Sequence, residues 1–426
     1  MDLLRGILGI GTLVVLAWVL SENRRRFPLR TVVGGMALQW ALALLVLRTD
    51  LGRDVFTAIA NCVRVILDCT TDGARFVLGN LVDVRQESWG VVFAAKVLPS
   101  IIVFSSLSAL GYHLRVLQLV VRAMARVMTR LMGVSGAESL SAAGNVFLGQ
   151  TEAPLLVRPF IASMTQSELA ALMVGGFATI SGGVMASYVA ILGGDDPQRQ
   201  VEVARHFLTA CLMSAPASFM IAKIMVPETG EPQTRGEVRL EVEQTHSNVV
   251  HAVANGASDG LKLALNVAAM LIAFIAVIAL VDKMLQAVGD LDAVQPLLER
   301  LELEELTLAG LLGFVFSPVA YLIGAEPQEC RAFGSLLGTA MATNEFVAYL
   351  SLSDLIAEGA VSERTVRLAT YSLCGFANLS SVAIQIAGIG GIAPQRRGDL
   401  ARLGLRAMLG GALACWMTGC IAGLLT

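Results

Sequence analysis

The chain has 426 residues, of which 55% are apolar or aromatic and only 15% are charged, and its mean hydropathy is +0.69. Soluble proteins carry roughly 25% charged residues, so this composition excludes a disordered chain, a coiled coil and an ordinary cytosolic enzyme. The 31 basic and 34 acidic residues give a net charge of −3, which offers no basic excess for nucleic acid. We therefore predict an all-α protein that crosses the lipid bilayer several times.

Eight segments are apolar enough, and close enough to the roughly 20 residues a bilayer requires, to be predicted as transmembrane helices. Arg24, Arg25 and Arg26 follow the first segment rather than precede it, which indicates a retained helix with its N-terminus outside and not a cleaved signal peptide. Alternation from there leaves both termini outside. The predicted spans are about 3–20, 31–47, 90–112, 168–192, 201–226, 260–282, 363–392 and 400–424.

Three further segments are predicted to lie outside the apolar slab. Segment 48–88 has mixed charge and is placed on the outer surface, and segment 228–256 is placed in the cytoplasm. Arg122, Arg126 and Arg130 recur every four residues opposite apolar side chains. This spacing predicts an interfacial amphipathic helix on the cytoplasmic side.

Two segments, 138–165 and 328–352, are apolar at both ends and carry amides, hydroxyls and one glutamate in the middle. A carboxylate at membrane depth persists only when it is paired or lines a wet cavity. We therefore predict two re-entrant hairpins whose polar tips, at Glu152 and Glu345, meet near the midplane.

The sequence also contains an internal repeat. GFATISGGV (176–184) and GFANLSSVA (375–383) share the pattern Gly-Phe-Ala-polar-apolar-Ser, and each follows a glutamate-tipped hairpin. Counting crossings, the first hairpin enters from inside and the second from outside, so the two halves are inverted. Inverted repeats with discontinuous helices are typical of secondary transporters.

The polar residues of these motifs indicate the class of ligand. They are rich in amides and hydroxyls, which suits an uncharged solute with many hydroxyls and ring nitrogens. The two glutamates could also carry protons or bind a cation. The set is Asn145, Gln150, Thr151, Glu152, Thr179, Asn344, Glu345, Asn378, Ser380 and Ser381.

At these residues the chain resembles the concentrative nucleoside transporters over nearly its whole length. The motifs that carry the resemblance are GQTEAPLLVRPF (149–160), GFATISGGV, TNEFVAY (343–349), CGFANLSSVAIQIAGIGG (374–391) and PQRRGD (394–399). The resemblance implies a symporter that imports nucleosides such as uridine, cytidine and adenosine across a bacterial inner membrane. It also implies a homotrimer and an elevator-type movement.

The resemblance further implies a division of the chain into domains. Scaffold helices would occupy 1–112, including the outer segment 48–88, together with a scaffold helix at 257–285. The first half of the transport domain would be 113–226, with the interfacial helix, hairpin 138–165 and two spans. The second half would be 298–426, with another interfacial helix, hairpin 328–352 and two spans.

Individual site residues are carried over from matching motif positions. The resemblance places the nucleobase beside Gln150, Thr151 and Glu152, and the ribose hydroxyls beside a second set, Glu345, Asn378 and Ser381. It places Phe376 beside the substrate and Val184 in an apolar wall near the base. The implied ligands of a co-transported sodium ion are the side chains of Asn145 and Thr179 and the carbonyls of Leu148 and Ile180, all oxygen donors as a hard cation requires.

Three alternatives remain open from the residues. The symporter could couple to protons instead of sodium, although the chain keeps the asparagine and GQTEAP pattern of sodium-coupled members. The carrier could move another small polar solute, such as a carboxylate or a free base. A membrane-embedded hydrolase using Glu152 and Glu345 lacks a plausible nucleophile, metal cluster or histidine partner. The preference between pyrimidine and purine nucleosides is not set by the sequence.

Overall fold

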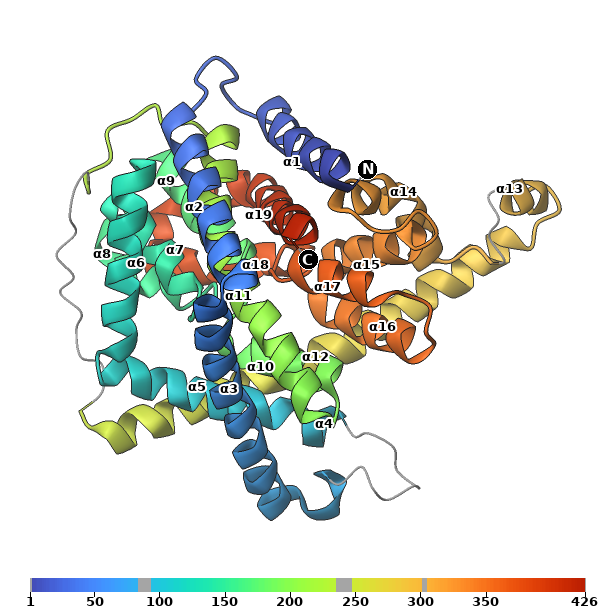
Figure 1. Cartoon of the computed structure of the whole chain (residues 1–426), viewed down its shortest axis with the longest axis horizontal. Coiled ribbons are helices and arrows are strands. Elements are labelled where there is room, and N and C mark those ends of the chain that lie inside the picture. Colours follow the sequence, from blue (N-terminus) through green and yellow to red (C-terminus); the bar gives the residue numbers. More distant parts are fainter. Residues whose placement is uncertain (1, 83–92, 235–246, 301–304, 426) are drawn as a thin grey trace.

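The computed structural model describes residues 2–82, 93–234, 247–300 and 305–425, and within these ranges the secondary structure is helical throughout (Figure 1). The predicted all-α fold is confirmed. Parts of several predicted segments fall on residues 83–92, 235–246 and 301–304. Those parts of 48–88, 90–112, 228–256 and 298–426 lie outside the described residues.

Most of the predicted spans agree with observed apolar helices to within a few residues. Among the described residues, six stretches are long and apolar enough to cross a membrane, and two further predicted spans match shorter apolar helices. The long stretches contain α2 (Leu29–Arg48), α4 with α5 (Phe93–Lys96, Leu98–His113), α9 with α10 (Gln166–Phe177, Gly182–Gly193), α11 (Pro197–Met225), α12 (Val249–Gly289) and α19 (Arg397–Leu425). The shorter ones are α1 (Asp2–Val19) and α18 (Leu379–Ile392), which follows α17 (Glu363–Ser372).

The segments between the spans differ more from the prediction. The predicted connection 228–256 is too long, because α12 begins at Val249, where the side chain of Asn248 caps the helix. Much of segment 48–88 is one long helix, α3 (Asp50–Leu78), which starts directly after α2 and continues into η1 (Gly79–Val82). The predicted amphipathic helix is confirmed as α6 (Val116–Met132), which buries Val121 and Met128.

The helix that precedes the second hairpin is apolar along its whole length. After the short α13 (Gln295–Arg300), α14 (Leu308–Ile323) carries no charged residue. It packs closely on α15 (Cys330–Ala342): a Cβ added at Gly334 would lie 2.7 Å from the carbonyl oxygen of Gly313. The interfacial helix expected before the second hairpin stays a prediction.

Both hairpin segments are observed as two helical arms around a short turn. In the first half, α7 (Gly136–Asn145) is followed by η2 (Ala153–Val157) and α8 (Arg158–Ile161). In the second half, α15 is followed by α16 (Glu345–Ala357), which the Asn344 side chain caps. A final short turn, η3 (Pro394–Arg396), leads into α19.

The two repeated motifs form breaks in helices that lie against each other. Residues 178–181 separate α9 from α10, and residues 373–378 separate α17 from α18. A Cβ added at Gly375, in the second break, would lie 2.5 Å from the carbonyl oxygen of Phe177, at the end of α9. Glycine is therefore required at Gly375 for the two breaks to approach so closely.

Burial separates inner helices, α9 to α11 and α19, from outer helices that include α5 and α12. In the apolar windows of α9–α10, α11 and α19, 89%, 89% and 83% of residues are buried, against 11% in α12. The long α12 runs beside α5 across the molecule (Figure 1), and Gly256 and Gly260 let its backbone approach α5. The side of α12 away from α5 is apolar and exposed, which suits lipid or subunit contact.

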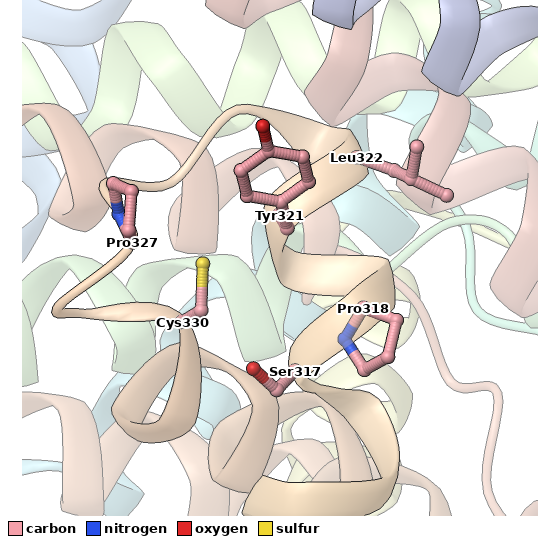
Figure 2. A pocket seen from close by; sticks show the side chains of 6 residues that line it. All are labelled: Ser317, Pro318, Tyr321, Leu322, Pro327 and Cys330. Carbon is pink, nitrogen blue, oxygen red and sulfur yellow. The ribbon is translucent and has the colours of Figure 1, made fainter.

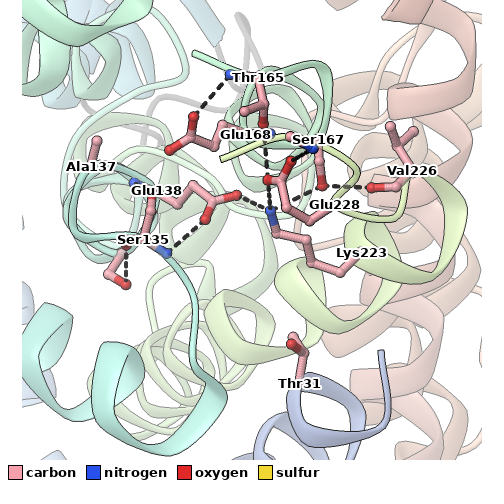
Figure 3. Close-up of polar contacts among 12 residues, drawn as sticks. Thr31, Ser135, Ala137, Glu138, Thr165, Ser167, Glu168, Lys223, Val226 and Glu228 are labelled. Atoms are coloured by element: carbon pink, nitrogen blue, oxygen red, sulfur yellow. Dashed lines mark hydrogen bonds and ion pairs between the residues drawn. The ribbon is translucent and has the colours of Figure 1, made fainter. Parts of the chain in front are cut away.

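A buried ion cluster fixes the base of the first hairpin (Figure 3). The Lys223 ammonium, at the end of α11, pairs with the Glu138 carboxylate of α7 and donates to the Ser167 hydroxyl of α9 at 3.0 Å. Glu138 also closes a capping box with Ser135, and Glu228 lies 3.3 Å from the ammonium. The cluster therefore ties the hairpin to the end of α11 and to the start of α9.

Lys223→Met should strongly destabilise the protein, because Glu138 is 1% exposed and would keep a buried, uncompensated charge. The expected loss is about 3–5 kcal/mol, seen as a lower apparent melting temperature in detergent. The control is Lys262→Met, whose ammonium lies 3.1 Å from Asp259 with 71% of its side chain exposed, and which should cost at most about 1 kcal/mol. Equal effects of the two variants would contradict the role of this cluster.

Candidate functional site

The start of α18 organises the polar site. Asn378 is the N-cap of α18, and its Oδ1 accepts from the backbone N–H of Ser381 at 2.8 Å and from the Ser380 hydroxyl at 2.7 Å. This cap satisfies a backbone donor that the helix break would otherwise leave unpaired in an apolar region. It also holds the Asn378 amide nitrogen and the Ser381 side chain at fixed positions.

The Asn378 amide nitrogen joins the second hairpin to this helix. Its Nδ2 donates to Oε2 of Glu345 at 2.8 Å, and the Tyr188 hydroxyl of α10 donates to Oε1 at 2.8 Å. All three side chains are buried. Each carboxylate oxygen has a second lone pair, so Glu345 can still accept hydrogen bonds from the hydroxyls of a solute.

The first hairpin reaches the same helix from the other half of the repeat. Gln150 is buried, and its Nε2 donates to the Ser381 hydroxyl at 3.2 Å. Its Oε1 accepts from Nε2 of Gln385, also on α18, at 3.0 Å. Four predicted substrate residues, Gln150, Glu345, Asn378 and Ser381, therefore belong to one connected network.

The other four predicted substrate residues each lie within four positions of a network residue along the chain, but their side chains make fewer polar contacts than the network residues do. Thr151 and Glu152 are exposed at the hairpin tip, and Oε2 of Glu152 accepts from the Gly149 N–H at 3.3 Å. Phe376 is buried in the break before α18, and Val184 is buried in the first turn of α10. The structure does not join these four to the network by a side-chain hydrogen bond.

Asn145 is a buried residue whose side-chain amide makes no hydrogen bond. The residue is 1% exposed, and neither its Oδ1 nor its Nδ2 has a hydrogen-bond partner. It lies beside α9, since a Cβ added at Gly175 would be 3.2 Å from its Nδ2. A buried amide without partners is costly, so an additional group that binds the Asn145 oxygen would offset that cost.

The other predicted sodium ligands lie in the turn of the first hairpin and in the break after α9. The Thr179 hydroxyl donates to the Gly175 carbonyl at 3.0 Å, which leaves its oxygen lone pairs able to bind a cation. Leu148 and Ile180 are buried, and the hairpin is tied to the helix break by the Gly182 N–H, 3.3 Å from the Phe147 carbonyl oxygen. The four predicted ligands are all oxygen donors, which suit a hard cation, and the Ile180 carbonyl oxygen also lies 3.9 Å from Cys211 Sγ.

Two residues of the network were not predicted from the sequence. Tyr188 lies one turn after Val184 on α10, and Gln385 one turn after Ser381 on α18. Each is a polar residue placed four positions after a predicted contact within an apolar helix. That spacing puts both on the same helix face as the predicted residue, and this signal could have identified them.

A separate apolar pocket contains none of these residues (Figure 2). It lies where α14 turns into α15, and Arg5 of α1 sits over the ring of Tyr321 at 4.7 Å from its centre. Since it lacks the amide and carboxylate groups of the network, we assign no solute to it. Its lining residues are Ser317, Pro318, Tyr321, Leu322, Pro327 and Cys330.

Comparisons with known proteins cover the whole chain. Family models described as Na⁺ dependent nucleoside transporter match at residues 8–81 (N-terminus) and 206–423 (C-terminus), and a nucleoside recognition model matches 94–195. An uncharacterized transporter of Haemophilus influenzae is 42% identical, covering 100% of this chain and 98% of that protein. The nucleoside permease NupC of Helicobacter pylori is 37% identical, over 98% of this chain and 96% of the permease.

A solved structure has the same fold. The chain matches CNTnw in an inward-facing substrate-bound state with a TM-score of 0.90 and 39% sequence identity, covering 100% of both chains. The family consists of membrane transporters and not enzymes. The resemblance seen in the sequence motifs is confirmed, and the chain belongs to the family of Na⁺ dependent nucleoside transporters.

Proposed function

We propose that this protein is a sodium-coupled symporter that imports nucleosides across a bacterial inner membrane. The observation that carries the proposal is the connected network of Gln150, Ser381, Asn378 and Glu345. It brings amide and hydroxyl donors together with a carboxylate acceptor, from both halves of the repeat. A nucleoside has complementary groups, since its base offers ring nitrogens or carbonyls and its ribose offers hydroxyls.

Within this proposal each predicted residue keeps its role. Gln150, Thr151 and Glu152 contact the base, with Val184 as an apolar wall, whereas Glu345, Asn378 and Ser381 hold the ribose. Phe376 lies beside the substrate. Support comes from the pairing of Glu345 with Tyr188 and Asn378, which orients a carboxylate that can accept from two ribose hydroxyls.

Sodium is the coupling ion in this proposal. The unpartnered Asn145 amide and the Thr179 hydroxyl, with the carbonyls of Leu148 and Ile180, are its ligands. Asn145 ends α7, a few residues before Gln150 in the same hairpin. Sodium bound here would order the turn that carries Gln150, so ion and nucleoside would favour the same state and raise each other's affinity.

We propose an elevator movement in a homotrimer. The moving domain comprises both hairpins with α9–α11 and α17–α19, and α5 and α12 belong to the scaffold. The exposed apolar side of α12 supports this placement, because it can contact subunits or lipid. The scaffold also includes α1, α2 and α3, all within 1–112, so movement must break the buried 3.0 Å hydrogen bond from Gln39 of α2 to Thr418 of α19.

Proteoliposomes with an inward sodium gradient should accumulate radiolabelled uridine above equilibrium, whereas matched choline at constant pH should allow equilibration at most. The physical reason is that coupled binding lets sodium drive uridine inward. Uridine accumulation with a proton gradient alone would keep the substrate and reject the sodium site. No uptake of any nucleoside would favour a carrier of another small polar solute.

Asn145→Ala should abolish the stabilisation that sodium gives the purified protein, and reduce uridine affinity with it. Because the Asn145 amide has no partner in the structure, its removal should leave the melting temperature without sodium unchanged or higher. The measurement is thermal unfolding in sodium or choline, followed by uridine uptake. A variant that retains the full sodium response would contradict the proposed ion ligand.

Glu345→Gln should reduce uridine affinity by about tenfold or more, because the new amide nitrogen would face the Tyr188 or Asn378 donor and remove an acceptor. The sodium-dependent stabilisation should remain, since Asn145 is untouched. Binding is measured by calorimetry with uridine. The control is Glu358→Gln, an exposed residue at the end of the same helix, and equal losses in both variants would argue against the ribose contact.

A further inference from the structure

Gln385 is a buried polar residue to which the proposed function gives no role. It is 0% exposed and lies on α18, one turn after Ser381. Its side-chain nitrogen reaches two other elements, the hairpin residue Gln150 and the α9 residue Met173. It therefore lies where the first hairpin, α9 and α18 meet.

The backbone carbonyl of Met173 fixes the orientation of the Gln385 side-chain amide. Nε2 of Gln385 lies 3.2 Å from the carbonyl oxygen of Met173, which can only accept. Turning the Gln385 amide over would place its oxygen against that carbonyl and against Oε1 of Gln150, two repulsive contacts. The nitrogen must therefore face both acceptors, while Oε1 of Gln385 is buried without a donor.

This orientation determines that of Gln150. The second N–H of Gln385 donates to Oε1 of Gln150 at 3.0 Å, so the Gln150 oxygen is turned toward Gln385. The Gln150 nitrogen then faces the Ser381 hydroxyl at 3.2 Å. Since the Ser381 oxygen accepts this bond, its own hydrogen is free to donate, as is the second N–H of Gln150.

The first GFA motif makes room for this arrangement. A Cβ added at Gly176 would lie 2.7 Å from Nε2 of Gln385 and 3.1 Å from Cβ of Gln150. Any larger residue would therefore push the Gln385 amide away from Gln150. The glycine of this motif is explained by the Gln385–Gln150 contact and not by a backbone conformation, because its φ is not in the left-handed region.

We propose that Gln385 is a positioning residue that selects the nucleobase. By locking the Gln150 amide, it makes the base-facing edge of the site a hydrogen-bond donor, through the second N–H of Gln150, while the Ser381 hydroxyl stays directed to the ribose. The edge then favours nucleosides whose base places a carbonyl oxygen or an unprotonated ring nitrogen against it. This inference rests on the proposed function, because it assumes that the network binds a nucleoside.

The test compares nucleosides that differ by one acceptor on the base. The panel is uridine with 4-thiouridine, which keeps N3–H and replaces the 4-carbonyl oxygen by a weakly accepting sulfur, and adenosine with its 1-, 3- and 7-deaza analogues, each of which replaces one ring nitrogen by C–H. Binding to the full-length protein is measured by calorimetry in sodium. The wild type should bind at least one analogue about tenfold more weakly than its parent, the usual effect of one lost hydrogen bond in a buried site.

In Gln385→Glu this discrimination should fall to within about twofold. An ionised carboxylate offers Gln150 only acceptors, and in the protonated form the single O–H donates to the Met173 carbonyl oxygen, which can only accept. In either form the Gln150 amide turns its nitrogen toward the carboxyl group and its oxygen toward Ser381. Gln385→Met should also lower the discrimination, because it removes the donor that holds Oε1 of Gln150. Gly176→Ala should do the same by displacing Gln385.

The control is Gln39→Met, which removes another fully buried glutamine whose Nε2 donates to Thr418. It should keep the wild-type ratio between parent and analogue, whatever its effect on stability. If Gln385→Glu does not fold, Gln385→Met gives the decisive ratio. Unchanged discrimination in the Gln385 variants overturns the inference, as does a wild type that binds every analogue as well as its parent. Absence of any nucleoside binding by the wild type would instead overturn the proposed function.

Discussion

The structure depends on satisfying backbone groups where two helices are interrupted inside an apolar bundle. An interrupted helix exposes N–H and C=O groups that lipid cannot pair. The second helix segment of each pair begins with a side-chain cap, Ser181 for α10 and Asn378 for α18. The two breaks then pack against each other at Gly375 and Phe177, which places both capped helix starts near one point.

The proposed binding network grows out of these caps. Asn378 uses its oxygen to cap α18 and its nitrogen to hold Glu345, so one side chain performs a structural task and orients a proposed binding residue. Gln150 is held in the same way between Ser381 and Gln385. Groups fixed by protein partners lose little freedom when a solute arrives, which favours affinity and a defined donor and acceptor pattern.

The two ends of α7, the first arm of the first hairpin, differ in whether their buried polar groups have partners. At its base, Lys223 and Glu138 form a buried pair supported by capping boxes. At the other end of α7, the side chain of Asn145 has no hydrogen-bond partner. Breaking the Lys223–Glu138 pair would be costly, whereas a group that binds the Asn145 amide would offset the cost of leaving that amide unpaired. This contrast supports the proposal that an ion binds beside Asn145 and not at the base of the hairpin.

The sequence determined the membrane class, the broken helices, the hairpin segments and the main polar residues. These follow from local patterns: apolar length, charge placement and polar groups within apolar runs. It misplaced the start of α12, because length and composition alone do not say where a helix meets its neighbours. Only the tertiary structure placed Tyr188 against Glu345 and Gln385 between Gln150 and Met173. Those contacts join residues far apart in the chain, and the direction of each hydrogen bond depends on a partner that no local pattern specifies.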